Sequence, residues 1–235
     1  AVVSTLAAMT GRRTLCVTLP IHQAQAQVDR AGEHVRRLTE RYSNAEAAHA
    51  DLTAAYDAFA GSFAPSLVQG AGKGVADLAG ANARSRLRMT ALYYFAGLNN
   101  LLVAGTGNKI EDFGVGFFTK YGDGGVDISP IADLTKTEVY ELGRWLRVPE
   151  AILVAPPTDG LFGDDRTDEQ QIGATYPELE RAMAHAERGT DPALLSGRER
   201  EVYDIFLRRN RANRHKMEPI PVCRIPRYLV EPAGR

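Results

Sequence analysis

The segment that constrains the possible folds most is residues 101–136, LLVAGTGNKIEDFGVGFFTKYGDGGVDISPIADLTK. Its first part, residues 101–104, is an apolar run of the length and flanking that suit a buried strand. The small residues 105–108 follow, and they allow tight turns and the close approach of a phosphate to main-chain N–H groups. This order predicts a phosphate site at the end of a strand.

Charged residues and a second glycine-rich turn lie further along the same segment. Glu111 and Asp112 form a possible magnesium-ligand pair, Lys120 follows, and residues 122–127 contain too much glycine for a helix interior. Each pattern alone also fits a solvated surface, because glycine turns and mixed charges are common in α/β proteins. The combination is what favours a binding site.

Composition limits the class of protein. The 235 residues, 44% of them hydrophobic, are enough for one sizeable domain with a core. Cys16 and Cys223 lie far apart and have no zinc-ligand spacing, so neither a disulfide framework nor a zinc site is predicted.

The chain also lacks the features of nucleic-acid and membrane proteins. Its net charge of −1 provides no bulk attraction to nucleic acid or to an anionic membrane. There is no apolar run near ~20 residues, and the first residues lack the charged start and long apolar core of a signal peptide. We therefore expect a cytoplasmic protein with no nucleic-acid and no membrane partner.

Alternating strand and helix patterns predict an α/β fold. Residues 14–19 are β-branched and apolar and end at Pro20, as a buried strand does. Predicted helices cover residues 1–9, 20–42, 51–59, 75–97, 137–147, 176–188 and 197–213. Residues 70–74, GAGKG, lack the ending of a Walker loop and are interpreted as a linker.

Lys136 stands out from local sequence alone. Thr135 and Glu138 have the spacing of a capping box, so Lys136 lies in the first turn of a helix. A lysine there opposes the helix dipole unless an anion binds beside it. If a phosphate binds, the free N–H groups, the dipole and the ammonium act together.

The run GTGNKIEDFGVGFFTKYGDGGVDISPIADLTKTE resembles the signature segment of NAD synthetases, ligases that amidate nicotinic acid adenine dinucleotide (deamido-NAD) with ATP and ammonia. The resemblance implies a three-layer parallel sheet flanked by helices, of the adenine nucleotide alpha-hydrolase-like type. It implies one domain over residues 1–235, Mg²⁺ as cofactor and ATP as co-substrate. The carboxylate would be adenylated, and ammonia would then displace AMP, with no side-chain nucleophile.

The same resemblance assigns roles within and after the segment. It implies that Thr106 and Lys136 contact ATP, that Glu111 binds magnesium with Asp112 as the alternative, and that Lys120 and Asp127 contact deamido-NAD. The alternative to a substrate contact is a surface ion pair between Lys120 and Asp127. Residues 156–161, PPTDGL, resemble a further family segment in which Thr158 corresponds to an ATP contact.

Two more matches extend the implied dinucleotide site. The sequence NARSRLRMTALYY resembles a family helix and places Arg86 at a deamido-NAD contact, although a solvated arginine-rich face would look the same. A guanidinium suits this role because it presents a planar fork to phosphate or carboxylate. His215 and Lys216 resemble the family's C-terminal His-Lys motif, which reaches deamido-NAD.

One family feature is absent from the printed sequence. The helix at residues 1–9 begins without a capping residue, and the family's preceding strand and Ser-Gly-Gly-X-Asp-Ser pyrophosphate loop do not occur. We expect residue 1 to lie directly after that loop. A chain without the first strand and the loop would bind dinucleotide but make little NAD.

Several alternatives stay open at this point. The resemblance implies a homodimer, and ammonia would be free or supplied by a separate glutaminase. The absent loop allows a non-catalytic dinucleotide-binding relative instead. Another ATP pyrophosphatase-type synthetase, such as a GMP or asparagine synthetase, is the rival enzyme.

Overall fold

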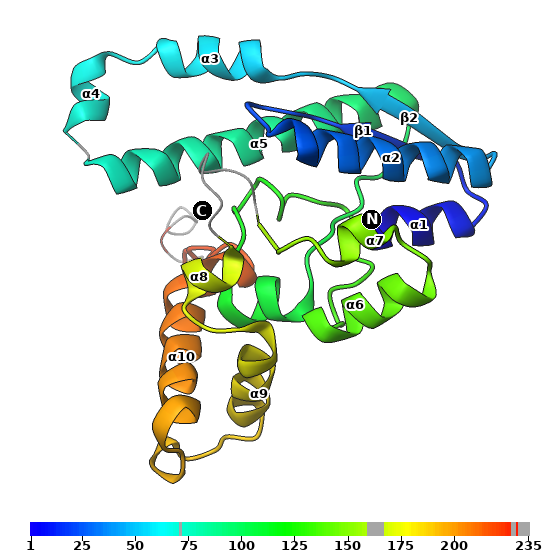
Figure 1. The fold of residues 1–235 in the computed structure, drawn as a ribbon. Helices are drawn as coiled ribbons and strands as arrows, with labels where there is room; N and C mark the ends of the chain where they lie inside the picture. The colour runs from blue at the N-terminus through cyan, green and yellow to red at the C-terminus, as the bar shows by residue number, and fades with distance from the viewer. Residues whose placement is uncertain (71, 159–166, 227–228, 230–235) are drawn as a thin grey trace, which may run out of the picture.

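A two-stranded parallel sheet lies near the N-terminal part of the fold. The computed structural model describes residues 1–70, 72–158, 167–226 and 229. Strand β1 (Thr14–Thr18) pairs with β2 (Ala45–His49) in parallel, with Thr14 opposite Ala45 and Thr18 opposite His49. Helix α2 (Gln25–Arg41) makes the crossover, and Figure 1 shows it lying along the sheet. The predicted α/β order of this region is confirmed.

A small core holds the sheet to its helices. Helix α1 (Val2–Met9) precedes β1, and Ala8 packs with Cys16, Leu38 and Ala45. The spacing of Leu38 on α2 turns its apolar side toward the strands, while charged residues of α2 face outward in ion pairs such as Arg36 with Glu40. The predicted helices at residues 1–9 and 20–42 are thus confirmed, the second from Gln25 onward.

Three helices follow the sheet, and the first two together with the first half of the third form an arm that extends away from it (Figure 1). They are α3 (Thr53–Gly61), α4 (Pro65–Gln69) and α5 (Lys73–Asn99). Pro65 is the first residue of α4, a position where the missing N–H of proline costs nothing. The long helix predicted at residues 75–97 is confirmed, and the predicted linker is shorter than expected because α5 already begins at Lys73.

The predicted strand at residues 101–104 does not form. Ala104 makes one isolated parallel bridge with Ile128, and Leu102 is exposed. Residues 127–128 form few hydrogen bonds with this run, because the N–H groups of Asp127 and Ile128 both donate to the same carbonyl, that of Val103. An apolar run without a full strand partner remains extended but does not become a ladder.

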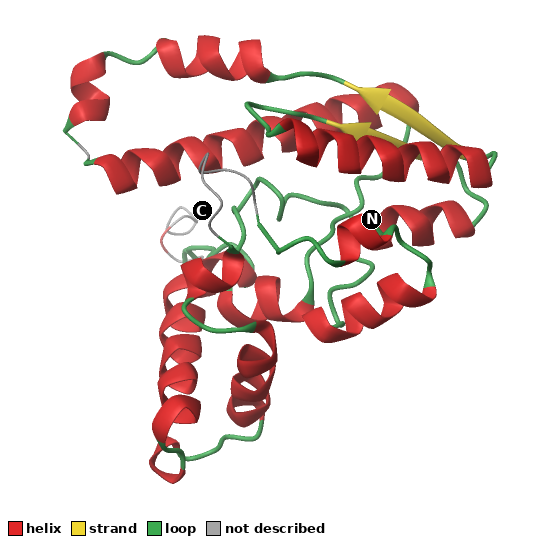
Figure 2. Ribbon diagram, viewed as in Figure 1, coloured by secondary structure: helices red, strands yellow, loops and turns green. Residues whose placement is uncertain are grey.

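The second half of the chain is helical (Figure 2). A π-helix (Lys109–Val115) is followed by α6 (Lys136–Trp145) and α7 (Glu150–Leu153). Then come α8 (Asp168–Ile172), α9 (Tyr176–Glu187), a short 3₁₀ turn (Pro192–Leu194) and α10 (Gly197–Met217). The helices predicted at residues 137–147, 176–188 and 197–213 are confirmed, within a few residues at their ends.

The largest core lies between α9, α10 and the π-helix. Its fully buried centre includes Val115 and Leu179, and Phe206 packs there from α10. Because α10 extends to Met217, residues 215 and 216 lie in its last turn rather than in a loose tail, which corrects the sequence interpretation. Among the described helices, none combines the length and apolar character that crossing a bilayer requires.

Candidate functional site

The site centres on an ion pair between Glu111 and Lys136. The Lys136 Nζ lies 2.7 Å from Glu111 Oε1, and only 18% and 15% of the two side chains are exposed. The Tyr176 hydroxyl donates to the same oxygen at 2.5 Å, and its ring lies under Lys136 Nζ at 4.8 Å. Three segments far apart in sequence therefore meet at one carboxylate.

The π-helix sets the direction of Glu111. Asn108, only 2% exposed, caps this helix by accepting hydrogen bonds from the N–H groups of Ile110 and Glu111 at 3.0 and 3.1 Å. Its side-chain amide also donates to the second oxygen of Glu111. A Cβ on Gly107 would overlap the Asp112 carboxylate, so glycine is needed for the close approach of this turn.

Capping boxes place the other two members of the centre. The Thr135–Glu138 box predicted from sequence is present, and it puts Lys136 at the first position of α6. A second box, Thr175–Glu178, puts Tyr176 at the first position of α9. Tyr176 was not predicted as a site residue, yet its capping box is readable in the sequence and would have placed it beside a helix N-terminus.

Glu180 of α9 links the N-terminal ends of α6 and α9. It accepts hydrogen bonds from the Thr137 N–H at 2.9 Å and from the Thr137 hydroxyl at 2.8 Å. One side chain of α9 thus satisfies a free N–H group in the first turn of α6. This link fixes Lys136 and Tyr176 relative to each other.

Asp112 follows Glu111 in the chain and is half-buried. Burial, then the charges of Asp123 and Glu111, raise the pKa of Asp112 from its ordinary 3.8 to about 7. Burial and the Glu111 charge also raise the pKa of Tyr176, which keeps its hydroxyl protonated and able to donate. The region therefore concentrates negative charge that a cation would offset.

These carboxylates fit a hard divalent cation. Glu111 and Asp112 provide the oxygen donors that Mg²⁺ prefers, and repulsion among the buried carboxylates is the condition that such an ion relieves. The described residues contain no cluster of three or more His, Cys, Asp or Glu side chains arranged around one metal position. Magnesium commonly completes its shell with water and substrate phosphate, so two carboxylates suit it.

A second group of cations gathers at residues 116–120. Arg86 donates to the carbonyl of Lys120 at 3.2 Å, and the Lys120 ammonium donates to the carbonyl of His215. Lys216 donates to the carbonyls of Gly116 and Phe118, both at 2.8 Å. Of the five residues assigned to deamido-NAD by resemblance, Arg86, Lys120, His215 and Lys216 are thus brought together by α5, α10 and this turn, His215 through its main-chain carbonyl.

Ser85 and Asp123 shape the turn that carries Lys120. The Ser85 hydroxyl donates to Asp123 Oδ1 at 2.7 Å, and the same oxygen accepts from the Thr119 N–H at 3.0 Å. A Cβ on Gly122 would overlap the Ser85 hydroxyl. The glycine is therefore a packing requirement, and Asp123, which sequence reasoning did not assign, is the acceptor that organises the turn.

The remaining predicted residues are Asp127, Thr106 and Thr158. Asp127 accepts from the Val103 N–H at 2.8 Å and from the Tyr93 hydroxyl at 3.0 Å, so it tethers the chain. Within the part of the chain that the structure describes, it forms no ion pair with Lys120. Thr106 is exposed after the Ala104–Ile128 bridge, and Thr158 is half-buried.

The chain is similar to proteins of one known family. Residues 1–220 match the family described as NAD synthase. Curated relatives include the NH(3)-dependent NAD(+) synthetase of Carboxydothermus hydrogenoformans, 45% identical over 139 residues, which are 59% of this chain and 52% of that protein. The corresponding protein of Archaeoglobus fulgidus is 43% identical over 155 residues, 66% of this chain and 59% of that protein. The chain spans about half the length of the curated relatives it matches.

Solved structures agree on the fold. An NMN synthetase from Francisella tularensis superposes with a TM-score of 0.79 at 30% identity, covering 95% of this chain and 84% of that one. An NH3-dependent NAD synthetase from Campylobacter jejuni gives a TM-score of 0.69 at 21% identity, covering 95% and 86%. These likenesses confirm the predicted parallel α/β fold of the adenine nucleotide alpha-hydrolase type.

Proposed function

The chain belongs to the NAD synthase family, and from that premise we propose that it is an ammonia-dependent ligase that amidates deamido-NAD to NAD at the expense of ATP. The observation that carries the proposal is the buried Lys136–Glu111 pair at the start of α6. The family resemblance implies an ATP contact for Lys136 and a magnesium contact for Glu111. Their side chains meet at 2.7 Å, which supports one shared phosphate and metal site.

The proposed reaction has two steps and no enzyme-bound covalent intermediate. The nicotinate carboxylate attacks the α-phosphorus of ATP, and the bond to pyrophosphate breaks. Ammonia then attacks the adenylated carbonyl, loses a proton, and displaces AMP to form the amide. The protein contributes by positioning the reactants and by neutralising charge that develops on the phosphates.

Lys136 is suited to that neutralisation. Its ammonium lies at the N-terminus of α6, where the helix dipole also favours an anion, while the N–H groups of Thr137 and Glu138 are already bonded to Glu180 and Thr135. Glu111, with Asp112 as the alternative, would hold Mg²⁺, which supplies charge neutralisation and orientation of the phosphates when bound. Tyr176 and Asn108 keep the Glu111 carboxylate oriented through hydrogen bonds to both of its oxygens. Thr106 and Thr158 are the further proposed ATP contacts.

The second cation group would hold deamido-NAD. Arg86, Lys120 and Lys216 now donate to neutral main-chain carbonyls, and each would gain a stronger, charge-assisted hydrogen bond from a phosphate or carboxylate. His215 lies in the same last turn of α10. The role of Asp127 follows from family resemblance, since its carboxylate serves as a backbone tether here.

A homodimer fits the unequal burial of the molecule. The arm formed by α3, α4 and the first half of α5 exposes a row of large apolar side chains; these are Phe59, Phe63, Leu67, Val75 and Leu78. Large exposed apolar residues gathered in one part of a protein are a common feature of subunit interfaces. We place the protein in the cytoplasm and leave ammonia as free or delivered by a separate glutaminase.

Three further functions are outcomes of the same assay. A family member similar to this chain is an NMN synthetase, so the mononucleotide of nicotinic acid is a second acceptor to test. A non-catalytic dinucleotide-binding protein would bind deamido-NAD without turnover. Another ATP pyrophosphatase-type synthetase would consume ATP only with a different acceptor.

The test measures NAD and AMP formation from deamido-NAD, ATP, Mg²⁺ and ammonium. Lys136→Met should lower kcat by about 100-fold or more, the typical effect of one electrostatic contact in a transition state. Lys109→Met is the matched control, because the half-buried Lys109 pairs with Glu187 and not with Glu111. Equal rates in the two variants would remove Lys136 from the site. Binding of deamido-NAD in isothermal titration, without any turnover, would favour the non-catalytic alternative. A kcat/KM that is higher for the mononucleotide than for deamido-NAD would identify the mononucleotide as the acceptor.

A further inference from the structure

A separate pocket lies where the C-terminal ends of three helices meet. Its lining comes from Met9 at the end of α1, Arg41 at the end of α2, and Trp145, Leu146 and Arg147 at the end of α6. The cavity has a volume of about 300 Å³. That volume lies at the lower end of the range for small-molecule sites. None of its lining residues belongs to either cation group described above.

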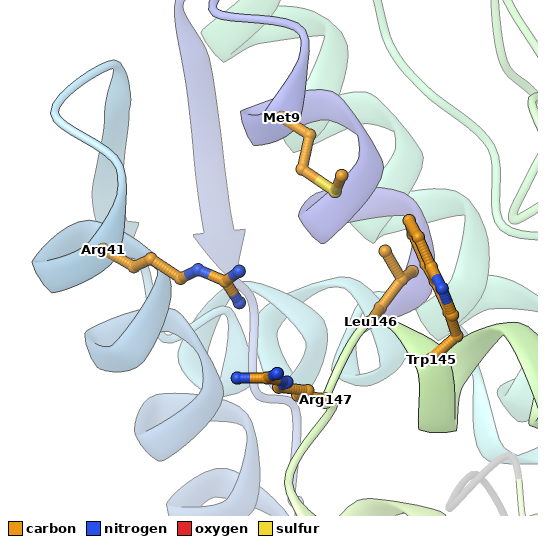
Figure 3. Close-up of a pocket in the computed structure, with 5 residues that line it drawn as sticks. All are labelled: Met9, Arg41, Trp145, Leu146 and Arg147. Atoms are coloured by element: carbon orange, nitrogen blue, oxygen red, sulfur yellow. The ribbon is translucent and has the colours of Figure 1, made fainter.

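Two guanidinium groups converge on this pocket. Figure 3 shows Arg41 and Arg147 extending toward the same space from different segments. Within the described residues neither guanidinium forms an ion pair, and the Arg41 guanidinium lies over the ring of Tyr42, 5.1 Å from its centroid. Nearby Arg36 and Arg37 on α2, by contrast, are both paired with Glu33. Two unpaired cations facing one cavity form a site for an anion.

The backbone of Arg147 is an independent observation. The Val148 N–H donates to the Gly143 carbonyl and the Arg147 N–H to the Arg144 carbonyl, both at 3.0 Å. This is a Schellman ending, in which the residue at the Arg147 position is usually glycine because its φ is positive. Arg147 has φ +59°, so an arginine is held in a conformation that strains any side-chain-bearing residue.

Helix electrostatics explain part of this arrangement. A basic residue near the end of a helix complements the dipole, which explains Arg41 and also favours a cation at Arg147. The dipole does not require that cation to stand at the strained position, because Arg144 already supplies a basic residue in the last turn of α6. A strained residue outside the helix that points a cation into a cavity indicates a use for the side chain itself.

The rest of the pocket is apolar. Trp145 exposes 71% of its surface, and Figure 3 shows it next to buried Leu146, across the pocket from the two arginines. An exposed indole provides a flat face on which a planar ring stacks. Neither a bare inorganic anion nor a neutral ring would use both halves of this surface.

From these contacts we infer that the pocket binds a small phosphate ester that carries a planar aromatic ring. The phosphate lies between Arg41 and Arg147, and the ring packs on Trp145 and Met9. This site is independent of the proposed ATP and dinucleotide sites. A ligand here would contact the ends of α1, α2 and α6 at once, and α6 is the helix that carries Lys136 at its other end.

The only tryptophan of the chain is Trp145, so its fluorescence reports on this pocket directly. The probe is phenyl phosphate, compared with inorganic phosphate and with phenol. Phenyl phosphate should change the emission saturably, and should bind at least ~10-fold more tightly than either fragment, because each fragment lacks one half of the contacts. Absence of a saturable change, or equal affinity for one of the fragments, would overturn the inference.

Arg147→Gly separates binding from folding. Glycine relieves the positive φ, so the melting temperature should stay equal or rise, while phenyl phosphate affinity should fall at least ~10-fold through loss of a charged hydrogen bond. Arg41→Gln should weaken binding in the same way, and Arg144→Gln is the matched control because Arg144 does not line the pocket. Lys136→Met should bind phenyl phosphate normally even if it loses ligase activity. Unchanged affinity in both Arg147→Gly and Arg41→Gln would exclude the site.

Discussion

The region built by α9, α10 and the π-helix and the arm built by α3, α4 and α5 are both helical, yet they bury their apolar residues very differently. The first encloses Val115, Leu179 and Phe206 in the largest core of the molecule. Helix α3 has no buried residue, and the arm exposes Phe63 and Leu78. Helix formation is therefore no measure of how much each region contributes to stability within one subunit.

The largest expected effect is in the compact region. Leu179 is completely buried in α9, and Leu179→Ala should lower the free energy of unfolding by about 2–5 kcal/mol, through lost transfer energy and a cavity. Leu78→Ala in the arm is the matched control, with 53% of Leu78 exposed, and should change it by less than about 0.5 kcal/mol. Urea denaturation of dilute protein measures both. Equal losses would show that the arm carries core contacts within the subunit.

The next effect concerns a polar contact of the same region. Tyr176→Phe removes the hydrogen bond to the Glu111 carboxylate and should cost about 1.5–3 kcal/mol of stability, as expected for a bond to a charged group. Tyr94→Phe on α5 is the control, since 67% of Tyr94 is exposed. The denaturation midpoints of the two variants give the comparison. A loss no larger than that of the control would mean that water replaces this hydroxyl without cost.

The acid limb of the stability curve should show a smaller effect. Hydrogen bonds from Arg198 and then from the Thr175 N–H lower the pKa of Glu178 from 4.5 to about 2. Since the folded pKa is depressed, this carboxylate stabilises the protein above pH 4.5, and the contribution is lost as the pH falls toward 2. Glu178→Gln should flatten the curve in that window, whereas Asp77→Asn, in the exposed face of α5, should not. Denaturation midpoints measured at successive pH values between 5 and 2, roughly one unit apart, provide the readout.

The smallest effect on the subunit itself is expected in the arm. Leu78→Asp should leave the stability of a dilute subunit within about 0.5 kcal/mol of the wild type. It should nevertheless shift a dimer toward monomer, because a charge at a subunit interface opposes association. Sedimentation velocity over a concentration series measures this change. A wild-type monomer at all concentrations would contradict the homodimer.

Local rules in the sequence predicted the parts of the site that are made locally. Thr135 and Glu138 are three residues apart, and their capping box placed Lys136 correctly at a helix start. Tyr176 and Glu111 are 65 residues apart, and no periodicity links them. The contact depends on how α9 packs against the π-helix, and local patterns in a single sequence do not predict that packing.

The two errors in the fold have the same origin. Residues 101–104 have strand composition, but a ladder needs a partner strand, and only Ala104 has a bridge partner. The helix predicted over residues 197–213 leaves His215 and Lys216 beyond its end, yet α10 continues to Met217, where Asn213 and Lys216 contact residues 115–118. Local sequence patterns did not predict that Asp127 tethers the backbone at Val103. The strand and loop expected before residue 1 stay a prediction.

The contact of Lys216 with the Gly116 carbonyl joins residues 100 positions apart, and this separation has a consequence for folding order. Closing so long a loop is entropically costly, so such contacts form after local helices and short-range turns. We therefore expect the dinucleotide half of the site to assemble late, after the β1–α2–β2 unit, whose strands are joined by a much shorter crossover. Pulse-labelled hydrogen exchange should protect the amides of β1 and β2 before those of residues 116–120. A newly made chain would then acquire its sheet well before it acquires the ability to hold its substrate.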